Sequence, residues 1–128
     1  MKIAALIARI LLGLMFFVFG LNGFLNFIPP PKNLPAGLAG QFSAVLMQSH
    51  FFLFVSALQV AGGALLLVNR YVPLALTLLG PVIVNIVLFH LLMERTGLLM
   101  AIVVLALWGI LLFRHRQSFA GIFVQRTS

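Results

Sequence analysis

The sequence predicts an all-α fold, a four-transmembrane-helix antiparallel bundle with a short extra helix in the first external loop. Three observations lead to this prediction. The chain of 128 residues is 63% apolar and only 7% charged, and Glu94 is its single acidic residue. A soluble domain has about a quarter of its residues charged, so this composition is typical of a protein surrounded by lipid. The apolar residues also fall into four long runs with Lys and Arg near their edges, and the short length predicts a single transmembrane domain over residues 1–128.

The four apolar runs predict helices over about residues 3–28, 50–68, 71–93 and 97–113, followed by a basic tail over residues 114–128. Each run is close to the roughly 20 residues that a helix needs to cross the hydrocarbon core of a bilayer. A spanning segment must satisfy its own backbone hydrogen bonds, which a helix does. The alternation typical of barrel strands is absent.

The connections between these runs predict how the helices follow one another. Three prolines at residues 29–31 end the first helix near Ile28, because proline lacks an N–H and fixes its own backbone. The stretch Leu38–Gln48 mixes apolar and polar residues and predicts the extra helix, either along the membrane surface or tucked back into the bundle. The short links at Asn69–Arg70 and at Glu94–Gly97 predict antiparallel neighbours.

Small residues predict where two helices approach closely. One ridge, on the second predicted helix, comprises Ala57, Ala61 and Ala64 with Gly62 and Gly63 beside it. Small side chains let helix backbones come close together within a membrane. The partner of this ridge is either the first helix, through Gly13, Gly20 and Gly23, or a second copy of the protein.

The basic residues predict the orientation of the chain in its membrane. Six lie on one side of the predicted helices, Lys2, Arg9, Arg70, Arg114, Arg116 and Arg126, against Lys32 and Arg95 on the other. Short cytoplasmic loops carry an excess of Lys and Arg. We therefore expect both termini in the cytoplasm, with the first long loop and the Glu94 turn facing outward.

Polar residues within the apolar runs gather in the outer half of the predicted bundle. They form the predicted ligand-binding set, which is His90, Glu94, Asn85, Gln59, Asn22, Asn26 and His50. Ionisable and polar residues at membrane depth commonly mark functional sites. Asn22 and Asn26 share a helix face by their spacing, as do His90 and Glu94. The second pair would relay a proton or hold a polar ligand group, and the whole set predicts an outward-facing polar pocket.

A structural interpretation of the same residues stays open. Asn85 and Gln59 can hydrogen-bond each other or a neighbouring backbone, as polar contacts between membrane helices do. His50 lies at a predicted membrane interface, where a histidine is tolerated, and Arg9 can extend its charged end to the membrane surface. No nucleophile–base arrangement, metal triad or phosphate loop is present in the sequence, so we predict no catalytic residue and no metal.

Three stretches taken in order resemble the DoxX family of small four-helix membrane proteins. They are Arg9–Phe16 with Phe19–Asn22, then Leu58–Leu67, then Gly80–Ile86 with Phe89–His90. The resemblance covers most of the chain, up to about Phe113. The family takes its name from a subunit of a thiosulfate:quinone oxidoreductase, and some members are linked to membrane redox complexes and oxidative stress resistance. The chain has no cysteine, which argues against the disulfide-linked roles of distant relatives.

This resemblance implies a non-catalytic subunit of a quinone-linked membrane redox system in the bacterial inner (plasma) membrane. Its expected ligand is an amphipathic small molecule such as a quinone, bound in the outward-facing polar pocket, with no metal. The expected partners are the lipid bilayer, a membrane redox enzyme and a second copy of the chain. Nucleic acid is not expected, because no basic stretch alternates with stacking aromatics. The alternatives are an assembly or scaffold protein without a ligand, and a small-molecule transporter that works as an oligomer.

Overall fold

The computed structural model describes residues 2–25 and 37–123, which are helical with short links and contain no strand. The elements in chain order are α1 (Lys2–Leu25), α2 (Leu38–Gln48), α3 (Phe51–Val68), α4 (Val72–Leu92), the 3-10 helix η1 (Arg95–Gly97), α5 (Leu98–Arg114) and the 3-10 helix η2 (Arg116–Phe123). Four helical stretches are long and apolar enough to cross a membrane, and α2 is the predicted extra helix. The predicted fold class is therefore confirmed. Residues 26–28 of the first predicted helix lie outside the described residues.

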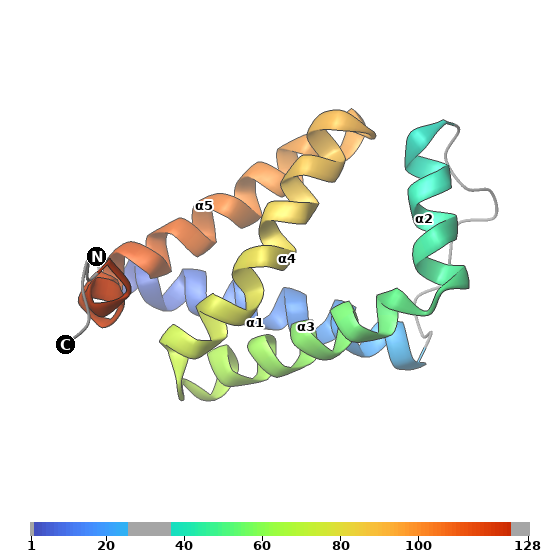
Figure 1. Cartoon of the computed structure of the whole chain (residues 1–128). Coiled ribbons are helices and arrows are strands. Elements are labelled where there is room, and N and C mark those ends of the chain that lie inside the picture. Colours follow the sequence, from blue (N-terminus) through green and yellow to red (C-terminus); the bar gives the residue numbers. More distant parts are fainter. Residues whose placement is uncertain (1, 26–36, 124–128) are drawn as a thin grey trace.

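The four long helices form two layers that meet at one end of the molecule and separate towards the other. Figure 1 shows α1 beside α3 in one layer and α4 beside α5 in the second. We call the end with the start of α1, the Asn69–Arg70 turn and the end of α5 the closed end. We call the opposite end, with η1 and α2, the open end. The layers diverge towards this open end.

Glycines bring α1 and α3 into close contact. A Cβ atom added at Gly63 would lie 2.5 Å from the backbone nitrogen of Phe17 and 2.8 Å from the carbonyl oxygen of Gly13. A Cβ atom added at Gly20 would lie 2.8 Å from the backbone nitrogen of Val60. Atoms of a backbone cannot move aside as a flexible side chain can, so this layer depends on its glycines. Of the two partners that the sequence leaves open for the ridge of small residues, the first helix is one that packs on Gly63 of α3.

The closed end is held by hydrogen bonds to helix ends. The last carbonyls of a helix lack partners within it. The Arg9 guanidinium of α1 donates to the carbonyl oxygen of Leu66, and to that of Leu67 at 3.3 Å, in the last turn of α3. The backbone nitrogen of Arg70 donates to Leu65 at 3.1 Å, and Asn69 adopts the left-handed conformation with φ of 57°. Arg9, which was expected to extend to the membrane surface, therefore caps a neighbouring helix.

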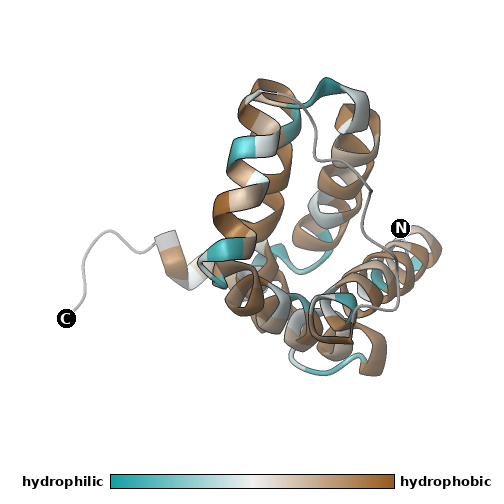
Figure 2. Cartoon of the chain, turned by 90° about the vertical axis from the view of Figure 1, so that its right-hand side faces the viewer, coloured by the Kyte–Doolittle hydropathy of each residue, from teal (hydrophilic) through white to brown (hydrophobic). Residues whose placement is uncertain are grey.

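The buried core lies in the closed half of the molecule. Its largest fully buried side chains are Leu12, Leu66, Leu76, Leu79, Ile83 and Leu111. Most other hydrophobic side chains are partly or fully exposed, and Figure 2 shows hydrophobic residues along most of each long helix. Exposed apolar side chains over this length of helix are what a bilayer requires of the surface that it surrounds.

Candidate functional site

A cavity of about 590 Å³ lies between α2, α3 and α4 towards the open end. Four phenylalanines from these three helices contribute to its walls, Phe42, Phe51, Phe54 and Phe89. The rings of Phe42 on α2 and Phe89 on α4 are 5.4 Å apart between centroids, so the two helices touch on one side of the cavity. A volume of this size is typical of a small-molecule site, and mostly apolar walls with a few polar groups are typical as well.

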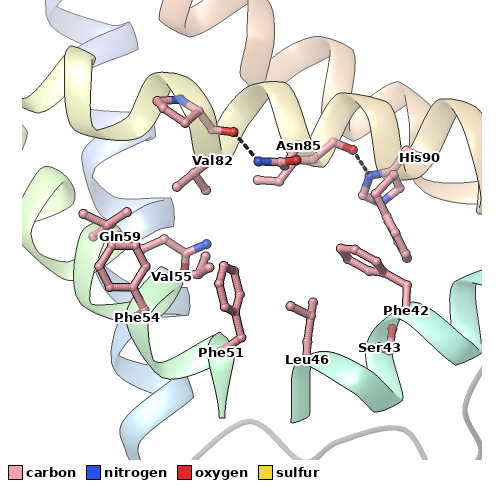
Figure 3. Close-up of a pocket in the computed structure, with 14 residues that line it drawn as sticks. Phe42, Ser43, Leu46, Phe51, Phe54, Val55, Gln59, Val82, Asn85 and His90 are labelled. Atoms are coloured by element: carbon pink, nitrogen blue, oxygen red, sulfur yellow. Dashed lines mark hydrogen bonds between the residues drawn. The ribbon is translucent and has the colours of Figure 1, made fainter. Parts of the chain in front are cut away.

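Three polar side chains of the predicted set border this cavity. Gln59 comes from α3, and Asn85 and His90 come from α4. Figure 3 shows Asn85 and His90 on one side of the cavity, with Gln59 and Phe51 on the α3 side and Phe42 on the α2 side. The prediction that these three residues share one pocket therefore agrees with their positions.

Asn85 has one of its polar groups engaged by its own helix. Its side-chain nitrogen donates to the carbonyl oxygen of Pro81 at 2.9 Å. Only the NH₂ group of an amide can donate to a carbonyl, so this contact fixes which end of the side chain is nitrogen. The amide oxygen of Asn85 and its second N–H then remain for a ligand. Pro81 itself lines the cavity and is exposed, so the engaged carbonyl lies at the edge of the site.

His90 is held in one orientation by three neighbours. Its Nδ1 atom lies 2.8 Å from the carbonyl oxygen of Ile86, one turn earlier on α4. The ring of Phe89 meets the imidazole in a T-shaped contact with centroids 5.2 Å apart. A Cβ atom added at Gly97 would lie 2.5 Å from Cδ2 and 2.6 Å from Nε2 of the ring, so the link before α5 fits the imidazole only as glycine. Such contacts restrict the ring before any ligand arrives.

A second cavity of about 170 Å³ lies deeper, among α1, α3, α4 and α5. Its walls are almost entirely apolar and include Phe16, Met15 and Val104. Gln59 and His90 border this cavity as well as the larger one. Both residues therefore stand at the boundary between the two spaces, so a ligand group at that boundary would reach polar partners on α3 and α4.

The expected pairing of His90 with Glu94 is replaced by other contacts. Helix α4 ends at Leu92, and Glu94 has an extended backbone with φ of −144°. The Glu94 carboxylate accepts from the Thr96 hydroxyl at 2.8 Å and from the Thr96 backbone nitrogen at 3.4 Å. It thus caps η1. The i, i+4 spacing places two side chains on one face only while the helix continues, and here it stops between them.

None of the other predicted site residues that the structure describes lines either cavity. His50 is exposed, adopts the left-handed conformation with φ of 62° and stands immediately before α3. Asn22 is half-buried on α1 and makes an interaction of its own. Asn26 lies outside the described residues. A ligand role for His50, Asn22 and Glu94 stays a prediction, although none of the three lines either cavity, and a ligand role for Asn26 stays a prediction as well.

The aromatic walls of the large cavity, and the α2 residues that line it, were not predicted. Phe42, Ser43 and Leu46 of α2 line the large cavity. A signal for them exists, since Phe42 and Leu46 are one helical turn apart and together give α2 an apolar face. The residues described here contain no cluster of three His, Cys, Asp or Glu side chains able to hold a metal ion. The described walls of the large cavity offer hydrogen-bonding groups and aromatic rings.

Comparison with known proteins agrees with this architecture. The family model for DoxX matches residues 4–91, which is more than half of the chain and includes Gln59, Asn85 and His90. Comparison with curated proteins gives no match, and comparison with solved structures gives none either. A family match of this extent, on a bundle with four helices able to cross a membrane, leads to one conclusion. The chain belongs to the DoxX family of membrane proteins.

Proposed function

We propose that this protein binds a ring-bearing amphipathic molecule of the quinone type in the cavity between α2, α3 and α4. The observation that carries the proposal is that Gln59, Asn85 and His90 border one otherwise apolar cavity of about 590 Å³. In a protein surrounded by lipid, polar side chains brought together in this way are better explained by a ligand than by chance. The protein then acts as a non-catalytic subunit of a membrane redox system.

The walls of the cavity suit such a ligand. Phenylalanine rings favour offset or edge contacts with another flat ring, and Phe51 and Phe54 are both exposed at the cavity. Because they are exposed on a surface that we assign to the bilayer, a long apolar tail can leave the cavity between α3 and α4 and lie among lipid chains. The ligand would thus enter from the membrane rather than from water.

The polar groups suit the head of the ligand. Gln59 is half-buried and makes no hydrogen bond with any of the described residues. Among the described residues that are buried or half-buried, every side-chain nitrogen or oxygen atom either has a hydrogen-bond partner or reaches the molecular surface. The Gln59 amide has no such partner, so it borders open space. A carbonyl or hydroxyl on the ligand ring would supply the partner that this amide lacks.

Native mass spectrometry of the full-length chain, released from detergent micelles after incubation with a short-tailed benzoquinone, tests the proposal. We expect one ligand bound per chain in a saturable manner. Asn85→Leu removes an amide at the cavity with little change in volume and should weaken binding about tenfold, the effect of one lost hydrogen bond in a site shielded from water. Leu88→Ala is the matched control, because Leu88 is exposed on the same helix and does not line the described walls.

Absence of saturable binding, or equal binding by the wild-type chain and Asn85→Leu, would refute the proposal and favour a scaffold role. The redox assignment needs a second experiment. Affinity purification from native membranes should recover an oxidoreductase together with the chain in a stoichiometric ratio. Recovery of the chain with ligand but without an enzyme would leave a ligand-binding protein outside any redox complex.

A further inference from the structure

His90 determines which hydrogen-bonding group the head of the ligand must carry. A carbonyl oxygen accepts hydrogen bonds and cannot donate them. The 2.8 Å contact between Nδ1 of His90 and the carbonyl oxygen of Ile86 therefore requires that Nδ1 carry the proton. A neutral imidazole has only one N–H, so its Nε2 atom is then an acceptor. The backbone of α4 thus fixes the tautomer of the ring.

No carboxylate among the described residues competes with a ligand for this ring. Glu94 is the only acidic residue in the chain, and its carboxylate bonds Thr96. His90 takes part in no ion pair with any residue that the structure describes. In its neutral form, the imidazole therefore presents Nε2 to a ligand as a hydrogen-bond acceptor.

The Nε2 atom is accessible. Among the described side chains that are buried or half-buried, every nitrogen or oxygen atom without a hydrogen-bond partner reaches the molecular surface. His90 is half-buried, and the spaces that it borders are the two cavities. Gly97 packs closely on the Cδ2–Nε2 edge of the ring, so a ligand group must reach Nε2 from the side of the cavities. A ligand group at the boundary of the cavities can thus approach Nε2.

We infer that the site selects a ligand whose head is a hydroxyl group, a phenol or hydroquinone, over the same molecule with a carbonyl or an ether there. The inference rests on the proposed function and specifies it further. A hydroxyl donates to Nε2 of His90 and accepts from an N–H of Gln59 or Asn85, so it satisfies groups on both sides of the cavity. A carbonyl or an ether only accepts, which leaves Nε2 without a partner in a site shielded from water.

A matched pair of probes tests this selection. 4-Nonylphenol and its methyl ether, 4-nonylanisole, share a ring and a tail and differ in the hydroxyl donor. Both are added at equal concentration to the full-length chain in detergent micelles, and native mass spectrometry measures the ratio of the two complexes. We expect the phenol complex to exceed the ether complex about tenfold, the effect of one hydrogen bond that the ether cannot make.

Two variants connect the selection to His90. His90→Phe keeps a ring against Gly97 and Phe89 but removes the acceptor, so the ratio of phenol to ether should fall to about one while the ether still binds. Gly97→Ala keeps His90 and places a methyl group against the Nε2 edge, so it should lower phenol binding more than ether binding. The Gly97→Ala result stands independently if the His90→Phe chain does not fold.

The outcomes separate the two proposals. Equal binding of phenol and ether to the wild-type chain would overturn the selection by hydroxyl while a ligand site remained. Failure of both probes to bind, while the benzoquinone binds in a saturable manner, would overturn the inference but not the proposed function, whereas failure of all three would overturn the proposed function itself. A ratio near ten that persists in His90→Phe would also overturn the inference, because the discrimination would then come from another residue.

Discussion

The closed and open ends of this bundle are built from the same four helices but serve different purposes. At the closed end, the contact of Gly13 with Gly63 and the Arg9 cap hold α1 and α3 together, and large side chains such as Leu66 and Leu76 are fully buried. At the open end, the layers separate around a cavity bordered by Gln59 and His90. The contrast suggests that tight packing in one half allows the other half to carry polar groups without the fold being lost.

The largest effect is expected from a side chain added between α1 and α3. Gly63→Leu would place atoms against the backbone of Gly13 and Phe17, where a Cβ atom already comes within 2.5 Å. Neither helix can move away without separating the layer, so we expect a loss of about 3 kcal/mol in the free energy of unfolding. Chemical denaturation in mild detergent, followed by circular dichroism, measures it.

Gly109→Ala is the control for this substitution. It lies within α5, and no atom outside its own stretch of helix comes within 4 Å of a Cβ atom added there. Alanine favours helix over glycine, so stability should stay the same or rise by up to about 1 kcal/mol. If both variants lose stability equally, close contact through glycine does not distinguish the closed end.

Removal of the Arg9 cap should give the second largest effect. Arg9→Met keeps an unbranched apolar side chain and removes the donors to Leu66 and Leu67. The carbonyls at the end of α3 then lose a charged partner at a half-buried position, and we expect a loss of about 2 kcal/mol. Arg70→Met, at an exposed residue of the same turn, should change stability much less, and a similar loss in both would show that charge alone matters.

A substitution at the open end should separate ligand binding from stability. Gln59→Leu replaces an amide that has no hydrogen bond among the described residues by an apolar group of similar size. The free energy of unfolding should therefore change by less than about 1 kcal/mol. Binding of the benzoquinone probe should weaken about tenfold in the same mass-spectrometric titration. A large loss of stability without a change in binding would instead make Gln59 a packing contact.

The positions of the helices and of the central site residues could be predicted, because a single physical effect determines each of them. Long apolar runs must become helices in lipid. Gln59, Asn85 and His90 interrupt such runs, and polar groups in that setting gather away from lipid, so that all three border one cavity. The glycines of α1 were predictable as contact points for the same reason, because only their backbone can meet another backbone so closely.

The remaining features depend on local geometry that spacing does not reveal. The end of α4 at Leu92 separates His90 from Glu94, although their spacing fits a helix face. The ridge on α3 was only partly right. Gly63 faces α1 and Gly62 faces α4, whereas Ala57 and Ala61 are exposed on the surface of the bundle. The neighbouring helices determine which face of a nearly uniform apolar helix turns inward. The sequence of that helix alone therefore does not reveal its buried face.

The smallest predicted effect concerns pH at the closed end. Partial burial, together with the positive charge of Arg114, lowers the pKa of His115 below its ordinary value of 6.5. The unfolded chain then binds the proton more readily than the folded chain does. The contribution of His115 to stability is therefore complete above pH 6.5 and is lost as the pH falls through the lower pKa of the folded state.

Denaturation of the wild-type chain and of His115→Gln at several pH values between about 7 and about 5 measures this contribution. The wild-type chain should lose slightly more stability than the variant as the pH falls, while Gln59→Leu, changed at the other end, should follow the wild-type curve. NMR titration of the His115 ring checks the cause directly. A midpoint above 6.5, or a steeper loss in His115→Gln, would contradict the sign of the shift and the partial burial on which it depends.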